Sequence, residues 1–133
     1  MEPTYLNVLG QCRLVNDVIS LVGDKWSVLI IMSLGSGRRR FSEIKRTVTG
    51  ISQKMLTVTL RGLERDGYVL RTVHAEVPPR VEYELTELGR DLLVPLHALG
   101  EWAMENHDRV AQARTVYDAR NGLAPAQVRP AAE

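Results

Sequence analysis

The chain has 133 residues, of which 44% are hydrophobic and 25% are charged, and its formal net charge is +1 at pH 7. This composition is typical of one globular domain with a tail and excludes a chain that is disordered throughout. The longest uninterrupted apolar run, Val28–Met32, is far shorter than the roughly 20 residues of a membrane span, and the N-terminus has no signal-peptide pattern. We therefore expect a cytoplasmic protein with no membrane partner. The single cysteine, Cys12, excludes an internal disulfide and a CxxC metal or redox site.

The small net charge conceals an uneven distribution of charge along the chain. Residues 25–80 hold eleven basic and four acidic residues, a net charge of +7, whereas the rest of the chain carries −6. A basic segment of this kind indicates a polyanionic partner. The alternative is a solvated basic surface with no partner.

Apolar spacing predicts helices over residues 12–22 and 25–34, the second of them mostly buried. After Gly35–Gly37 comes a short segment from Phe41 to Val48, in which Ser42 is expected to be the N-cap of a helix of one to two turns. The helix with the clearest signals starts after an N-cap at Ser52 and ends at Asp66. Ile51 and Leu56 form a hydrophobic staple at its start. An apolar stripe follows at Leu56, Leu60 and Leu63. Gly67 is suited to the left-handed conformation that ends a helix.

The apolar period then changes from that of a helix to that of a strand. Residues 68–73 and 80–85 alternate as two strands of a hairpin around a stiff loop that contains Pro78 and Pro79. Thr86 is the expected N-cap of a long helix that reaches about His107, with a bend at Pro95 and Gly100. The chain thus divides into an N-terminal arm (1–11), a folded domain (12–107) and a C-terminal tail (108–133).

A short helix, a turn, a second helix and a hairpin in this order predict an α+β, mostly helical fold, a winged helix-turn-helix with a two-stranded wing and a long C-terminal helix. A helix of this kind fits the major groove of DNA, and the hairpin reaches the adjacent backbone or minor groove. The helix after Ser52 carries polar and basic side chains opposite its leucine stripe, with no acidic residue among them. We expect base contacts from Gln53, Lys54, Thr57 and Arg61.

Val58 is unusual on that polar face. It either contacts a thymine methyl group or is covered by a neighbouring helix.

A second set of residues is expected to contact the DNA backbone, and so to position the protein rather than to read the sequence. These residues precede or lie on the short helix, flank the second helix, or follow the wing loop: Arg38, Arg39, Arg40, Ser42, Lys45, Ser52, Arg65 and Arg80. For Arg80 an ion pair with a carboxylate is the alternative to a contact with DNA.

Five runs in the same order carry a resemblance to a known family: Gly23–Trp26, Arg40–Ile44, Gly50–Thr57, Leu60–Gly67 and Val77–Thr86. Over residues 12–107 the chain resembles the HxlR-type family of bacterial winged-helix regulators, which are relatives of the MarR group. The resemblance implies a homodimeric DNA-binding transcription factor, more often a repressor than an activator. It also implies a dimer interface made by the first helix and the long C-terminal dimerisation helix, and hence a pseudo-palindromic operator. Arg13, where the family commonly has proline, and Val58, where a polar residue is usual, depart from the pattern.

Cys12 is the candidate for sensing a signal. At the start of a helix and next to Arg13, its thiol has a lowered pKa, which favours the thiolate and oxidation. A cysteine at this place recurs in redox-sensing members of the resembled family. The alternative is an inert, buried cysteine and a regulator that responds to a small molecule.

The sequence contains no signature of catalysis, and we expect neither an enzyme nor a bound metal or cofactor. His97 and Glu101 lie one helical turn apart, but two ligands do not make a metal site. A winged helix that binds another protein and no DNA is the alternative from a different functional class. It would more typically expose a contiguous apolar patch than a basic helix face.

Overall fold

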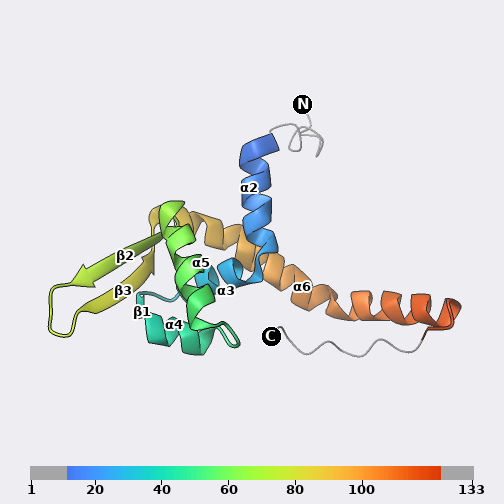
Figure 1. Ribbon diagram of the computed structural model, residues 1–133. Helices are drawn as coiled ribbons and strands as arrows, with labels where there is room; N and C mark the ends of the chain where they lie inside the picture. Colours follow the sequence, from blue (N-terminus) through green and yellow to red (C-terminus); the bar gives the residue numbers. More distant parts are fainter. Residues whose placement is uncertain (1–11, 124–133) are drawn as a thin grey trace.

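The computed structural model describes residues 12–123, and the arm at 1–11 and residues 124–133 lie outside the described part. Eight elements follow one another along the chain: α2 (Cys12–Gly23), α3 (Lys25–Ser33), β1 (Arg39–Arg40), α4 (Phe41–Thr47), α5 (Gln53–Arg65), β2 (Val69–His74), β3 (Arg80–Leu85) and α6 (Glu87–Arg120). Helices α3, α4 and α5 cluster together, and the β2–β3 hairpin projects from them (Figure 1). Helix α6 starts near the base of the hairpin and extends well beyond the cluster, and α2 meets the cluster at its C-terminal end, where Leu21 and Val22 pack on the core. The predicted winged helix-turn-helix with its long C-terminal helix is confirmed.

The core is built around α3, whose sequence is apolar on almost every side and which therefore has to be buried on several faces. Its residues Ile30 and Ile31 are fully buried. The other fully buried large side chains come from the helix-turn-helix and from the end of α3: Leu34, Ile44, Leu56 and Leu60. The leucine stripe predicted for the helix after Ser52 is therefore the face by which α5 packs on the core.

Polar side chains cap the starts of α5 and α6, as the sequence predicts, whereas the start of α4 differs from the prediction. The Ser52 side chain accepts a hydrogen bond from the backbone N–H of Met55, and that of Thr86 accepts one from Gly89. Both predicted N-caps are confirmed. The prediction for Ser42 is wrong, because α4 begins at Phe41, two residues before the start that a cap at Ser42 implies. Its N-cap is Arg40, whose backbone N–H donates to the Glu43 carboxylate at 3.1 Å.

The sheet has a third strand that alternation does not reveal. Its order is β1-β3-β2, and β1 is only two residues long. Arg39 lies opposite Tyr83, and Arg40 lies opposite Glu82. Two consecutive arginines give no alternating apolar signal, so this strand is recognisable only from its pairing.

The predicted end of the last helix at about His107 is wrong. Helix α6 is continuous through Pro95 and ends at Arg120, before Gly122 with φ +64°. The residues after His107 include alanines, arginines and a glutamine, which favour helix, and no glycine or proline occurs before Gly122. The weak apolar pattern there reflects a helix that lies away from the core rather than a loop. None of the helices within residues 12–123 combines the length and apolar character that a membrane span needs.

The start of α6 is tightly joined to the turn that ends α5. Gly67 has φ +84°, the left-handed conformation expected at the end of a helix. The next residue, Tyr68, accepts a hydrogen bond at its carbonyl from the backbone N–H of Thr86 at 3.1 Å, and the Thr86 hydroxyl donates to the carbonyl of Gly67. A Cβ on Gly89 would lie 2.2 Å from the same Tyr68 carbonyl oxygen. The turn after α5 and the start of α6 therefore meet backbone to backbone at this junction.

Candidate nucleic-acid interface

Three of the four predicted base-contacting residues line one groove. Gln53, Thr57 and Arg61 follow one another at four-residue intervals along α5. Together with side chains of α4, β2 and β3 they border a cavity of about 280 Å³, which we call the helix–wing groove. Its lining consists of Phe41, Gln53, Thr57, Leu60, Arg61, Glu64, Arg71 and Tyr83. The groove runs between the polar face of α5 and the face of the wing that carries Tyr83.

The helix–wing groove includes an acidic residue, which corrects the interpretation of this helix face as free of acid. Glu64 lies one turn after Leu60 and lines the groove beside Arg61. Sequence reasoning assigned Glu64 to neither face of the helix. A phosphate group that enters this groove meets one carboxylate among its basic side chains.

The fourth predicted base-contacting residue, Lys54, is exposed at the start of α5 and lies outside the helix–wing groove. Ser52, which caps the helix, and Arg65, in its last turn, are exposed as well. Val58 lies on a different side of α5. It borders a groove between α2 and α5 with Leu21 and Met55 and keeps 57% of its surface exposed, so the neighbouring helix covers it only in part.

A second groove, of about 530 Å³, lies between the start of α4 and the wing loop. Three residues that we expect to contact the DNA backbone line it, namely Arg40, Ser42 and Arg80, together with Glu76 and the Pro78–Pro79 loop. Phe41 borders this groove and the helix–wing groove alike. The structure thus brings six of the predicted contact residues to two adjoining grooves. Lys45 is exposed further along α4.

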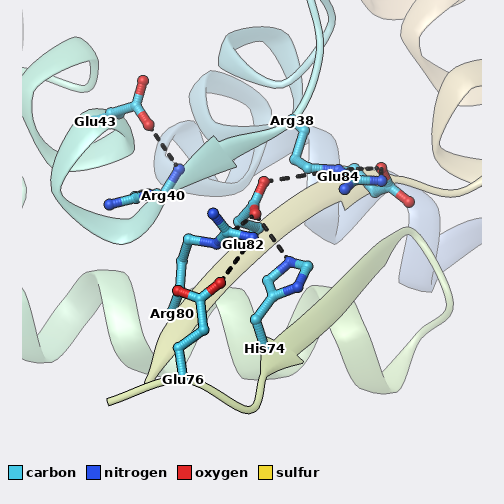
Figure 2. Close-up of polar contacts among 8 residues, drawn as sticks. All are labelled: Arg38, Arg40, Glu43, His74, Glu76, Arg80, Glu82 and Glu84. Carbon is cyan, nitrogen blue, oxygen red and sulfur yellow. Dashed lines mark hydrogen bonds and ion pairs between the residues drawn. The ribbon is translucent and has the colours of Figure 1, made fainter. Parts of the chain in front are cut away.

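The predicted wing arginines are engaged by carboxylates of the wing itself (Figure 2). Arg80 Nε lies 3.1 Å from Glu82 Oε1, and its Nη2 lies 3.4 Å from Glu76 Oε1. His74 Nε2 approaches the same Glu82 oxygen at 2.9 Å. Both nitrogens are buried, and neither contact has the geometry of a hydrogen bond. For Arg80 the structure shows the alternative that the sequence left open, an ion pair with a carboxylate.

Arg38 and Arg39 also have partners inside the protein. The Arg38 guanidinium donates from Nε to Glu84 Oε2 at 3.0 Å, and its Nη2 lies 3.0 Å from the same oxygen. Arg39 donates from Nε to the Ser33 carbonyl at 2.9 Å and from Nη2 to the Ser36 hydroxyl at 2.9 Å. Arg39 therefore fastens the loop that follows α3, and Arg38 ties this loop to β3.

One basic residue of the helix–wing groove is absent from the sequence-based set. Arg71 is exposed on β2, opposite Tyr83 in the register, and lines the groove across from α5. The alternating pattern of this strand could have indicated Arg71. Arg71 stands between Val69 and Val73 on the strand face that turns toward the helix, where an apolar residue is usual.

Cys12 is the first residue of α2, and its side chain lies outside the described part of the structure. Along residues 12–123, no three side chains of the His, Cys, Asp and Glu types gather where they could hold a metal ion. His97 Nδ1 and Glu101 Oε1 lie 3.5 Å apart on the exposed surface of α6, as an ion pair or hydrogen bond between neighbouring turns.

Comparison with known proteins identifies the family. Residues 21–111 match the model of the HxlR-like helix-turn-helix family. The chain belongs to this family. An uncharacterized HTH-type transcriptional regulator of Methanothermobacter thermautotrophicus is 49% identical over 88 residues, which cover 66% of this chain and 67% of the relative. HxlR-like membership makes the protein a helix-turn-helix transcriptional regulator that binds DNA, and not an enzyme.

A redox regulator and a diamide-treated transcriptional regulator are among the solved structures similar to this HxlR-like chain. The redox regulator HypR in its reduced form has a TM-score of 0.70 and 40% identity, and the match covers 74% of this chain and 97% of that one. Diamide-treated YodB from Bacillus subtilis has a TM-score of 0.62 and 40% identity, covering 71% of this chain and 93% of that one. A redox regulator is therefore among the structural neighbours of this chain.

Proposed function

We propose that this HxlR-like protein is a homodimeric, sequence-specific repressor that inserts α5 into the major groove of a pseudo-palindromic operator. The observation that carries the proposal is the alignment of Gln53, Thr57 and Arg61 along one groove between the recognition helix and the wing. Amide, hydroxyl and guanidinium groups match the donor and acceptor patterns of base edges. Lys54, next to Gln53 at the exposed start of α5, completes the base-contacting set.

Backbone contacts are assigned to side chains that stay exposed around these two grooves. Arg40 and Ser42 at the start of α4, Lys45 on α4, and Ser52 and Arg65 at the ends of α5 form this set. Arg38, Arg39 and Arg80 are assigned a structural role, because their guanidinium groups already bind groups of the wing and of the loop after α3. They contribute to the shape of the surface that DNA meets.

The homodimer is supported by apolar side chains that the single chain leaves uncovered. On α2, Val18 and Ile19 are exposed, and on α6 Leu99, Trp102 and Tyr117 keep 51%, 57% and 61% of their surface exposed. A helix that projects from the body with an apolar face gains stability when a second helix covers that face. Two-fold symmetry then places the two recognition helices in half-sites about one helical turn apart.

The test is a binding measurement with the whole protein. The expected result is a dimer by light scattering, and binding of the DNA upstream of its own gene at least about a thousandfold tighter than binding of unrelated DNA of equal length, by fluorescence anisotropy at fixed salt. A monomer at micromolar concentration with equal affinity for both DNAs would contradict the proposal. It would favour a winged helix that binds another protein instead of DNA.

Redox control through Cys12 is a second proposal, favoured by the likeness to HypR and YodB. Two Cys12 thiols of a dimer lose two protons and two electrons to an oxidant and form an intersubunit disulfide, or one forms a mixed disulfide with a small thiol. We expect diamide, which accepts the two electrons and two protons, to change operator affinity of the wild type and not of C12S. Equal responses of the two proteins would refute redox control and favour a small-molecule effector with an inert cysteine.

A further inference from the structure

Arg71 occupies a position in the helix–wing groove that faces the recognition helix. It lies on β2, paired across the sheet with Tyr83, and lines the groove together with Gln53, Thr57 and Arg61. Val69 is buried and Tyr83 nearly so, which fixes this face of the strand toward α5. Arg71 and Arg61 therefore border the same groove, one from the wing and one from the helix.

The charge environment of Arg71 differs from that of the other wing arginines. Arg38 and Arg80 contact the carboxylates of Glu84 and Glu82. Among the described residues no carboxylate forms an ion pair with Arg71, including Glu64 in the same groove. An exposed guanidinium in a groove, with its five N–H donors unengaged by an acid, is suited to bind an oxyanion.

We infer that Arg71 is the wing residue that binds a DNA phosphate, across the helix–wing groove from the base-contacting Arg61. The inference rests on the proposed function, in which α5 lies in the major groove. The sugar–phosphate backbone that borders the major groove then runs along the mouth of the helix–wing groove, where Arg71 is exposed. Arg61 and Arg71 supply positive charge from both walls of the groove, whose lining also includes Phe41 and Tyr83.

A phosphate contact has a signature that distinguishes it from a base contact. We expect R71Q to weaken binding about tenfold, to a similar extent for the operator and for unrelated DNA, because a phosphate carries no sequence information. The slope of log affinity against log salt concentration should fall in magnitude by about 0.9. R90Q is the matched control, since Arg90 is exposed on α6 and lines neither groove, and it should leave the slope unchanged.

R71T, which retains a residue favourable to strands, should give the same reduced slope. Thermal unfolding of both Arg71 variants should match that of the wild type, because the replaced side chain is exposed and unpaired. An unchanged affinity and slope in R71T would overturn the inference, as would a loss confined to the operator, which would indicate a base contact. Failure of the wild type to bind DNA would instead contradict the proposed function, so the two outcomes are distinguishable.

Discussion

Replacing both Lys54 and Arg61 with glutamate (K54E/R61E) is expected to abolish operator binding, with a loss of at least about a hundredfold in affinity. Each substitution removes a donor for a base edge, worth roughly 1–3 kcal/mol when it pairs well, and places a negative charge against the phosphates. Both side chains are exposed, and no described residue forms an ion pair with either of them. The fold should therefore be unaffected, and fluorescence anisotropy against the operator measures the change directly.

The matched control is R90E/R120E, which changes the net charge by the same amount at exposed positions of α6. Light scattering should give the same mass for the wild type and both variants. If the loss in affinity were as large for R90E/R120E as for K54E/R61E, overall charge rather than the α5 surface would govern binding. A K54E/R61E variant that still binds the operator normally would remove α5 as the recognition helix.

The sequence determined most of the fold because its local signals agree with its tertiary packing. The Ser52 and Thr86 caps, the leucine stripe of α5 and the two alternating strands each indicate the element that forms. Strand β1 and the far half of α6 lack such signals. The first consists of two arginines, and the second projects away from the core, so its apolar residues are sparse and none of them packs in the core.

The candidate site was predictable on the helix and much less so on the wing. Residues 25–80 are strongly basic as a segment, but Glu82 and Glu84 follow just outside this segment on β3. Strand pairing places them against Arg38, His74 and Arg80, so part of the basic charge is neutralised within the protein. A charge count along the chain cannot show this, because the partners come together only when β3 pairs with β1 and β2. Arg71 was missed for the same reason, since its proximity to Arg61 depends on how the sheet packs on α5.

The largest effect on stability is expected for G89A. The new Cβ would lie 2.2 Å from the Tyr68 carbonyl oxygen and 3.1 Å from its carbon, and both are backbone atoms that no rotamer change can move. The start of α6 has to shift away from the turn after α5. This shift disrupts the bond from the Thr86 N–H to Tyr68 and the bond from the Thr86 hydroxyl to Gly67. We expect a loss of about 3 kcal/mol or more in the free energy of unfolding, measured by chemical denaturation.

G62A is the matched control for G89A, because it adds the same methyl group to a helix. A Cβ on Gly62 would meet no atom within 4 Å, and its position inside α5 gains about 0.5–1 kcal/mol from the higher helix propensity of alanine. The two variants should thus shift stability in opposite directions. Equal stability of G89A and the wild type would mean that the contact between α6 and Tyr68 is looser than described.

Because this contact joins the recognition helix to the helix proposed to form the dimer, folded G89A protein should also bind the operator more weakly than G62A does, through a changed spacing of its two recognition helices.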